Sequence, residues 1–364
     1  MKTRAALFLG AGRPLEVREI ELEEPQADEV VVRMAAVGIC GTDLHDVKGE
    51  WTRPRPMVLG HEGTGVVEEV GRSVSSLRRG DRVVLSWAPS CGECSDCRRG
   101  RPAVCVPLHR AIGAGTLVDG RTGMSLEGET VYRGTATGAL AERVVVAQKV
   151  ALPLGDDIPL EEAALLGCAA LTGVGAVLFA ARVEPEATIV VVGAGGVGQF
   201  VLQGARLAGA QTVVVVDPVE GRREQALRLG ATAAVAPEAL KGTMRDLLPE
   251  GADYAFDAVG APETTVLALR WTRSGGSCVV VGLPAAGARL DLDPGEFNRR
   301  EKWLTGTMYG SEDPGVALPI LLEHVRAGRL HLRPLLGPTF PLDRVNDAIE
   351  ASLAGSAGRV IVQP

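Results

Sequence analysis

Residues 188–198 read TIVVVGAGGVG, and this stretch decides how the second half of the chain folds. The unbroken apolar run from Thr188 to Val192 predicts a strand that is buried on both faces of a sheet. The glycines after it predict a tight turn into a helix, which we expect over residues 197–207. A strand, a glycine-rich turn and a helix in this order form the first unit of a doubly wound parallel sheet.

The pattern of strands and helices continues beyond this unit. We expect further strands at 212–216, 254–256 and 277–281, and helices at 221–229, 262–271 and 313–329. Before about residue 150, short β-branched runs instead alternate with Gly, Pro and Asp turn signals. A glycine-rich stretch at 113–138 interrupts these runs and predicts a long loop. The sequence therefore predicts an α/β fold in which a β-rich part precedes a Rossmann-type domain.

Length and composition limit the function classes. The chain has 364 residues, which is too long for one ordinary domain. Its 46% hydrophobic and 23% charged residues are typical of a soluble protein with large cores. A net charge of -7 argues against nucleic-acid and acidic-membrane partners. The apolar run near the N-terminus is too short for a signal peptide.

Residues 163–181 carry no charged side chain and approach the length of a membrane-spanning helix. Alanine and glycine dominate the segment, and no aromatic belt or Lys/Arg-rich loop frames it. We therefore expect a buried helix here, within a soluble, cytoplasmic protein.

The glycine-rich turn has the G-x-G-x-x-G spacing of dinucleotide-binding loops. Gly193 permits the tight turn, Gly195 lets the backbone approach a pyrophosphate, and Gly198 lets the helix pack closely on the strand. Gly196 and Val197 complete the loop, whose N–H groups at the helix start would hold phosphate charge. A flavin site and a Rossmann domain without a cofactor are also compatible with the pattern at this point.

Asp217 ends the next predicted strand, nineteen residues after Gly198. A carboxylate there can accept hydrogen bonds from an adenosine ribose and would repel a 2′-phosphate. The sequence therefore predicts NAD as the cofactor. Arg222 and Arg223 lie close enough along the chain to leave some NADP tolerance open.

Four of the seven cysteines lie in the stretch CGECSDCRRGRPAVC, at residues 91–105. Their spacing is C-x2-C-x2-C-x7-C, and the cysteines are Cys91, Cys94, Cys97 and Cys105. In a reducing compartment, clustered cysteines are more often metal ligands than disulfides. Four thiolates suit a closed, structural zinc site. An iron–sulfur cluster and a disulfide framework are the competing interpretations.

The remaining cysteines are Cys40, Cys168 and Cys278. A lone cysteine is usually a small buried hydrophobe, and we expect Cys278 to be one in its predicted strand. Cys40 and Cys168 with His61 would supply two thiolates and one imidazole. Three protein ligands leave a fourth position for water or an alcohol, which is typical of a catalytic zinc site.

With these motifs in this order, the chain resembles the zinc-dependent medium-chain alcohol dehydrogenases over nearly its whole length. The motifs are GICGTDLH at 38–45, GHE-x2-G-x5-G at 60–71, the four-cysteine lobe, GCAALTG at 167–173, and the Rossmann glycines with Asp217. The resemblance implies a GroES-like catalytic domain at 1–165 and 312–364, and a Rossmann NAD-binding domain at 166–311. We also expect two zinc ions per subunit and a homodimer or homotetramer.

The resemblance assigns roles around the catalytic zinc. Cys40, His61 and Cys168 take the places of its ligands. Glu62 takes the place of a carboxylate beside the metal. Asp43 takes that of the hydrogen-bonding partner of the histidine ligand, which would fix its tautomer.

Further positions that match the family concern the cofactor and the substrate. Thr172 matches a residue packed against the nicotinamide, and Arg359 a late arginine near the pyrophosphate. Trp51 and Trp87 occupy positions that line the substrate pocket in relatives. Gly41 departs from the pattern, because many relatives carry a cationic residue there that contacts the cofactor phosphates.

The expected chemistry follows from the residue types. Zinc lowers the pKa of a bound alcohol, so that an alkoxide forms near neutral pH. The Thr42 hydroxyl can take the proton and pass it through the cofactor ribose toward His45, and the carbon then gives hydride to NAD+. Alternatively, Thr42 is a turn-capping hydroxyl and His45 a solvated surface histidine.

The sequence thus predicts zinc- and NAD-dependent oxidation of a primary alcohol, aromatic or medium-chain, to the aldehyde, or the reverse reaction. Two further functions are compatible with the motifs. One is a thiol-adduct formaldehyde dehydrogenase, since the long 113–138 segment is similar to that of such enzymes. The other is a non-catalytic NAD(H)-binding protein that holds only the structural zinc.

Overall fold

The computed structural model describes every residue from Met1 to Pro364. The chain folds into two compact units. The first unit contains Met1–Cys168, Asp313–Pro319 and Leu336–Pro364, and the second contains Ala169–Glu312 and Ile320–Leu335. The predicted domains put residues 312–364 wholly in the first domain, so the structure differs at 320–335. In this segment Leu330 is buried, and the backbone of His331 exchanges hydrogen bonds of 2.7 and 3.0 Å with the Gln203 side chain.

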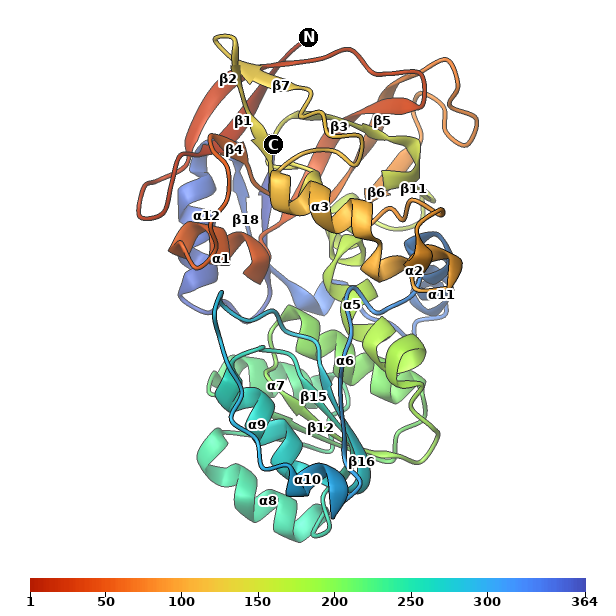
Figure 1. The fold of residues 1–364 in the computed structure, drawn as a ribbon, viewed down its shortest axis with the longest axis vertical. Coiled ribbons are helices and arrows are strands. Elements are labelled where there is room, and N and C mark those ends of the chain that lie inside the picture. Colours follow the sequence, from red (N-terminus) through yellow and green to blue (C-terminus); the bar gives the residue numbers. More distant parts are fainter. The chain divides into compact units, whose positions relative to one another are not determined.

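Two β-sheets form most of the first unit (Figure 1). Their strands are β1 (Lys2–Phe8), β2 (Glu16–Leu22), β3 (Glu29–Gly38), β4 (Met57–Val58), β5 (Glu62–Val70), β6 (Arg82–Leu85), β7 (Met124–Leu126), β8 (Glu129–Thr130), β9 (Tyr132–Arg133), β10 (Arg143–Ala147), β11 (Ala151–Leu154), β18 (Leu336–Pro341) and β19 (Arg359–Gln363). One sheet has the order β8-β7-β2-β1-β4-β9, and the other has β11-β6-β5-β3-β19-β18 with β10 also paired to β3. The last strand therefore returns to the unit in which the chain begins, and both chain ends lie there in Figure 1.

The core of the first unit is built from the strand residues of both sheets. Val30, Val31 and Val32 of β3 are fully buried, as are Val144 and Val146 of β10. Each such side chain contributes roughly 1.5–3 kcal/mol by leaving water. The short helices α1 (Gly41–Lys48), α2 (Ser95–Arg98), α3 (Val106–Ala114), α4 (Leu160–Ala163) and α12 (Val345–Leu353) connect or cover these strands.

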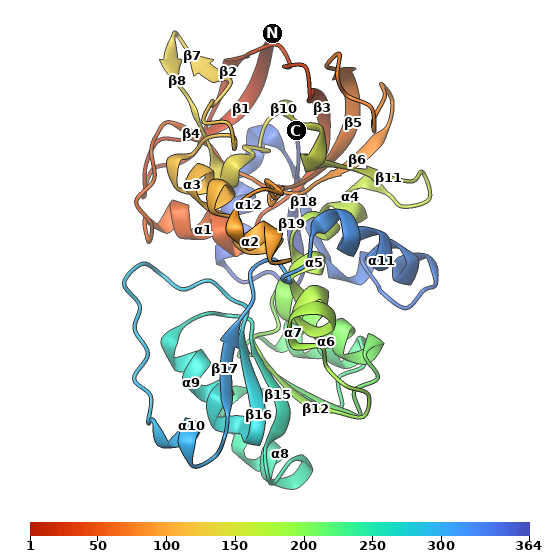
Figure 2. The same ribbon diagram turned by 45° about the vertical axis from the view of Figure 1, so that its right-hand side comes forward.

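The second unit contains one parallel sheet. Its strands are β12 (Thr188–Val192), β13 (Thr212–Val216), β14 (Ala233–Val235), β15 (Ala252–Asp257), β16 (Thr272–Val280) and β17 (Trp303–Gly306), in the order β14-β13-β12-β15-β16-β17. Its helices are α5 (Ala169–Gly175), α6 (Gly196–Leu207), α7 (Glu220–Arg228), α8 (Leu240–Leu247), α9 (Pro262–Trp271), α10 (Gly295–Asn298) and, in part, α11 (Pro314–Arg326). Figure 2 shows α6 and α9 on opposite sides of the sheet. The predicted doubly wound Rossmann sheet is confirmed.

The single helix predicted over residues 163–181 is wrong. The structure has α4, a 3-10 turn at Ala164–Gly167, α5 and a π-helical turn at Ala176–Ala181. The interruption lies at Cys168, whose φ of -145° and ψ of -68° are not helical. None of the helices has by itself the length and the apolar composition that a membrane-spanning helix needs. One bent pair, Leu160–Gly167 with Ala169–Ala181, has both when it is judged by length and composition only.

The predicted long loop at 113–138 is also partly wrong, because it contains strands. β7 and β8 form a hairpin, and β7 extends a sheet by pairing Ser125 with Glu21 and Met124 with Leu22 of β2. β9 pairs in parallel with β4. The segment is therefore part of a sheet of the first unit.

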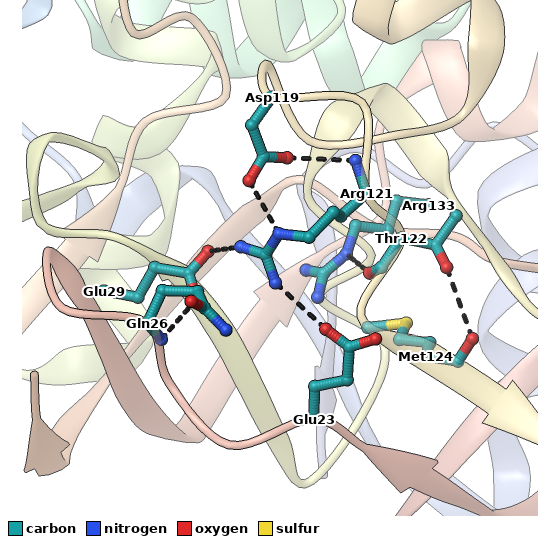
Figure 3. Close-up of polar contacts among 8 residues, drawn as sticks. All are labelled: Glu23, Gln26, Glu29, Asp119, Arg121, Thr122, Met124 and Arg133. Atoms are coloured by element: carbon teal, nitrogen blue, oxygen red, sulfur yellow. Dashed lines mark hydrogen bonds and ion pairs between the residues drawn. The ribbon is translucent and has the colours of Figure 1, made fainter.

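Arg121 contacts three carboxylates, drawn in Figure 3, and two of them, on Glu23 and Glu29, attach this segment to the rest of the first unit. Its Nη2 atom lies 2.5 Å from Oε1 of Glu29, which is almost fully buried. Its Nη1 atom is 3.0 Å from Glu23, and its Nε atom is 2.8 Å from Asp119. Isolated surface ion pairs stabilise little, whereas several charges that form one network contribute more. The contacts with Glu29 and Glu23 join residues 92 and 98 positions apart in the chain.

Arg133, also drawn in Figure 3, anchors the same segment from inside. Its side chain is fully buried, and burial lowers its pKa to about 10. Its Nη1 donates to the carbonyl of Thr137 at 2.9 Å, and its Nε donates to the carbonyl of Thr122 at 2.5 Å. The guanidinium therefore links a carbonyl before β9 with a carbonyl after it.

Candidate active site

The first unit brings Cys40, His61 and Cys168 together, with one ligand atom from each within 4.8 Å of the others. All three side chains are buried. Cys40 directly precedes α1, His61 lies between β4 and β5, and Cys168 occupies the break after α4. Two thiolates and one imidazole fit zinc and leave one position of a tetrahedral shell for another ligand.

Asp43 orients two members of this cluster. Its Oδ2 accepts a hydrogen bond from the backbone N–H of Cys40 at 2.9 Å, and its Oδ1 accepts one from Gly60 N–H at 3.0 Å. The same Oδ1 lies 3.4 Å from Nδ1 of His61. This arrangement leaves Nε2 of His61 to bind a metal, as second-sphere carboxylates do in other metal sites.

The protonation of the cluster reflects its close packing. A hydrogen bond with Cys168, aided by the charge of Arg359, lowers the pKa of Cys40 well below its ordinary value. The same hydrogen bond and burial raise the pKa of Cys168. Burial alone would lower the pKa of His61, but the charge of Asp43 raises it. Two thiols that share one proton in this way are well suited to a divalent cation, which stabilises both as thiolates.

Glu62 and Arg359 form a buried ion pair beside this cluster. Oε2 of the fully buried Glu62 lies 3.2 Å from Nε of Arg359, and Nη1 of Arg359 donates to the carbonyl of Ile39 at 3.0 Å. A Cβ on Gly38 would lie 3.0 Å from the carboxyl carbon of Glu62, so a larger residue there would press on this carboxylate. The structure thus places Arg359, which we expected near the pyrophosphate, against the acidic neighbour of the metal ligands.

The other predicted residues of the first unit are Thr42 and His45, which lie in α1, and Trp51 and Trp87. The Oγ1 atom of Thr42 is 3.7 Å from the Cys40 sulfur. His45 stacks on Trp51 with ring centroids 4.5 Å apart. The Trp87 ring stands edge-on to His61 at 6.3 Å.

Sequence reasoning missed Glu50. Its carboxylate forms a short hydrogen bond with Nδ1 of His45. The only signal in the sequence is Gly49, a residue type that commonly ends a helix and reverses the chain.

The four-cysteine lobe is a second cluster in the first unit, with its sulfur atoms within 4.8 Å of one another. Cys91 and Cys97 are 3.8 Å apart, and Cys94 and Cys97 are 3.5 Å apart, too far for disulfide bonds. All seven cysteines are free. Backbone N–H groups point at the sulfurs; those of Cys97 and Val106 lower the pKa of Cys94 to about 6. Four converging sulfurs fit a closed zinc shell.

The glycine loop of the second unit has the geometry that its sequence predicts. Gly193 has a φ of +90°, and a Cβ on it would lie 2.5 Å from Val259. A Cβ on Gly198 would lie 1.8 Å from the Gly193 carbonyl oxygen. Gly195, the N-cap of α6, faces open space, which a side chain would fill. A pyrophosphate fits this cradle at the helix N-terminus.

Asp217 lies at the end of β13, next to this loop, and is 3% exposed. Its Oδ2 accepts a hydrogen bond from Ala194 N–H at 2.7 Å, and its Oδ1 accepts one from Val219 N–H at 2.8 Å. Nη1 of Arg222 lies 3.8 Å from Oδ2, while Arg223 donates to the backbone carbonyl of Asp217 at 2.9 Å. Two backbone N–H groups, one of them in the glycine loop, thus hold the carboxylate in place.

Thr172, the last of the predicted cofactor contacts, is buried in α5 of the second unit. The predicted residues thus divide between the units: the metal ligands lie in the first and the dinucleotide loop in the second.

We predict that Gly198→Ala weakens dinucleotide binding, because its Cβ would displace the backbone of Gly193. Titration of NADH fluorescence should show at least a tenfold weaker affinity, about 1.4 kcal/mol or more. Gly242→Ala is the matched control, since a Cβ there meets nothing within 4 Å. Unchanged NADH affinity in Gly198→Ala would contradict the assignment of this loop.

Comparison with known proteins gives consistent matches. Residues 26–156 match the model of the alcohol dehydrogenase GroES-like domain, and residues 196–323 match that of the zinc-binding dehydrogenase domain. Alcohol dehydrogenase 6 of Peromyscus maniculatus is 33% identical, covering 100% of this chain and 98% of the relative. S-(hydroxymethyl)glutathione dehydrogenase of Escherichia coli (strain SMS-3-5 / SECEC) is 32% identical over the full length of both chains. The crystal structure of benzyl alcohol dehydrogenase from Acinetobacter calcoaceticus superposes with a TM-score of 0.93 at 30% identity, covering 100% of this chain and 99% of that one.

Proposed function

Because this chain belongs to the zinc-dependent medium-chain alcohol dehydrogenase family, we propose that it oxidises a primary alcohol to the aldehyde with NAD+, and catalyses the reverse reduction. The observation that carries the proposal is the buried cluster of Cys40, His61 and Cys168. A protein that only binds NAD(H) and a structural zinc has no need for a second, three-ligand cluster. The cluster therefore favours an enzyme over a non-catalytic NAD(H)-binding protein.

Cys40, His61 and Cys168 would hold the catalytic zinc. Zinc bound there lowers the pKa of a hydroxyl group at its open position and, in the reverse direction, polarises a carbonyl. Asp43, whose Oδ1 lies 3.4 Å from Nδ1 of His61, favours the tautomer with the proton on Nδ1. Arg359 balances the charge of Glu62.

The second unit supports NAD as the hydride acceptor. Open space at Gly195 and the N–H groups at the start of α6 suit a pyrophosphate. Asp217 can accept hydrogen bonds from a ribose and repels a 2′-phosphate. Arg222 is already paired with Asp217, which supports NAD over NADP.

Proton transfer is assigned to two residues of the first unit. Thr42 has its hydroxyl beside Cys40 and can accept the proton of the substrate hydroxyl. His45, three residues further along α1, is 20% exposed on its side chain and can pass the proton toward solvent. Thr42 is thus the inner end of the proton path and His45 the outer end.

We propose an aromatic or medium-chain primary alcohol as the substrate. Trp51 and Trp87 provide large apolar surfaces close to His45 and His61, and the similar benzyl alcohol dehydrogenase supports an aromatic group. A thiol adduct of formaldehyde is the second candidate substrate. The S-(hydroxymethyl)glutathione dehydrogenase of E. coli carries that activity in its name, and its similarity over the full chain supports this candidate.

We further propose a cytoplasmic homodimer or homotetramer. Thiolate metal clusters persist in a reducing compartment, which supports the cytoplasm. β17 is an edge strand of the sheet and exposes Trp303 to 69%, which supports pairing with a second copy of this chain.

The test is NADH formation measured by absorbance with the zinc-loaded protein. The substrates are benzyl alcohol, hexanol, ethanol, and formaldehyde with or without glutathione. We expect the highest kcat/KM for benzyl alcohol or hexanol with NAD+, and at least a tenfold lower value with NADP+. Turnover of formaldehyde only in the presence of glutathione would favour the second candidate. No NADH formation with any substrate would contradict both.

A further inference from the structure

Helix α1 ends in a turn that places Glu50 against His45. Gly49 has left-handed dihedral angles of φ 74° and ψ 22°, and its N–H donates to the Asp46 carbonyl at 3.0 Å. The N–H of Glu50 donates to the His45 carbonyl at 2.9 Å. This pair of hydrogen bonds defines a Schellman motif, which brings together the side chains of the two residues at its ends. These two positions are usually apolar, but here they are a histidine and a glutamate.

The hydrogen bond between them decides which ring nitrogen carries the proton. Oε2 of Glu50 bonds to Nδ1 of His45. A carboxylate can only accept, so the neutral ring holds its proton on Nδ1 and keeps the lone pair on Nε2. The ring is therefore prepared to receive a proton at Nε2.

The orientation of the ring is held by stacking. Trp51 lies against the His45 ring at 4.5 Å with an angle of 19° between the planes. The Arg53 guanidinium lies 5.1 Å from the Trp51 ring centroid and donates to the Ile112 carbonyl at 2.6 Å. The indole is thus fixed between the imidazole and the guanidinium, and His45 cannot turn without disturbing this stack.

The charged groups around the pair keep Glu50 available as an acceptor. Nζ of Lys48 lies 4.0 Å from Oε1 of Glu50, the carboxylate oxygen that does not contact His45. Arg53 is directed to Asp46, with Nε 3.4 Å from Oδ1. The side chain of Glu50 is 31% exposed, so that it is accessible to water.

We propose that Glu50 is a positioning residue for proton transfer through His45, an inference that rests on the proposed function. A proton that arrives at Nε2 forms the imidazolium cation, whose Nδ1–H stays hydrogen-bonded to Oε2 of Glu50. The proton on Nε2 then passes to water, which returns His45 to its neutral, Nδ1-protonated form. In the direction of aldehyde reduction, the same groups deliver the proton inward.

The first test reads the tautomer and needs no turnover. The zinc-loaded protein is labelled with ¹⁵N-histidine, which marks only five residues, and His45→Asn assigns the His45 signals. We expect the neutral wild-type ring to show a protonated Nδ1 and an unprotonated Nε2. Glu50→Gln, whose amide can donate or accept, should show a mixture. A wild-type ring protonated on Nε2 would overturn the proposal.

The second test measures the single-turnover rate of NADH formation. Glu50→Gln should slow it about tenfold, a part of the 10²–10⁴-fold that general acid–base catalysis supplies, with substrate KM nearly unchanged. Glu50→Asp should retain more of the rate than Glu50→Gln, and added imidazole buffer should restore part of the loss. Glu127→Gln, an exposed residue paired with Arg18, is the control and should keep the wild-type rate.

The outcomes separate this inference from the proposed function. An unchanged rate in Glu50→Gln, with only a lower melting temperature, would show that Glu50 is purely structural. If the wild-type protein forms no NADH from any alcohol, the proposed function fails, and the tautomer measurement still decides whether Glu50 positions the ring.

Discussion

Replacing Cys40 with serine is expected to reduce alcohol-dependent NADH formation by about 10³-fold or more, since metal-ion catalysis supplies several kcal/mol of barrier lowering. A serine hydroxyl stays protonated near neutral pH and is a poor zinc ligand, whereas the pKa of Cys40 is already lowered in its cluster. The fold should persist, because Cys40 lies at the edge of α1 and outside the main core of the first unit. Steady-state NADH absorbance and circular dichroism measure the two effects.

Cys278→Ala is the matched control for this variant. Cys278 is also fully buried, and burial raises its pKa to about 12, but it lies in β16 of the second unit and belongs to neither cluster. It should retain turnover within a factor of a few. Substantial alcohol oxidation by Cys40→Ser, with zinc still bound, would refute the role assigned to Cys40.

The second large effect is expected for Cys94→Ser, and it concerns structure. None of the α2 residues is buried, and three of the four lobe cysteines are only half-buried, so burial of apolar surface cannot hold this lobe. Structural zinc supplies about 10–16 kcal/mol of apparent binding energy in small zinc domains, and its loss should unfold the lobe locally.

Limited proteolysis with trypsin detects this local unfolding directly. Arg98 and Arg99 are exposed inside the lobe and become cleavable when its backbone opens. We expect rapid cleavage after these residues in Cys94→Ser, identified by mass spectrometry, and slow cleavage in the wild type. Ser95→Ala, a change at a neighbouring exposed residue, should behave as the wild type. Equal cleavage rates in Cys94→Ser and the wild type would show that the lobe needs no metal.

The second unit could be predicted from the sequence because its signals are local. The apolar run before Gly193 and the spacing to Gly198 depend on residues adjacent in the chain, and both have the expected geometry. β14, α8 and β17 were not predicted, since they are short and only partly buried.

Two failures in the first half have long-range causes. The segment at 163–181 is uncharged and rich in alanine, yet its helix is interrupted at Cys168, which belongs to the three-residue cluster. The segment at 113–138 has the composition of a loop, yet Arg121 forms ion pairs with Glu23 and Glu29, and β7 pairs with β2. Neither partner is visible in the local pattern.

The candidate site, too, could be predicted only in part. The ligand residues could be proposed because their types and order resemble a known family, but spacing alone did not decide whether Cys40, His61 and Cys168 form one site. Their convergence depends on the fold. Glu50 could not be proposed at all, because its contact with His45 comes from the turn at Gly49.

The central claim is that one cysteine cluster holds a catalytic zinc and the other a structural zinc. The zinc content per chain tests this claim most directly. Inductively coupled plasma mass spectrometry of the purified wild-type protein should find about two zinc ions per chain, one for each cluster. Cys40→Ser and Cys94→Ser should each retain about one. A single zinc ion in the wild-type protein, lost in Cys94→Ser and kept in Cys40→Ser, would contradict the account and leave the chain without a catalytic metal.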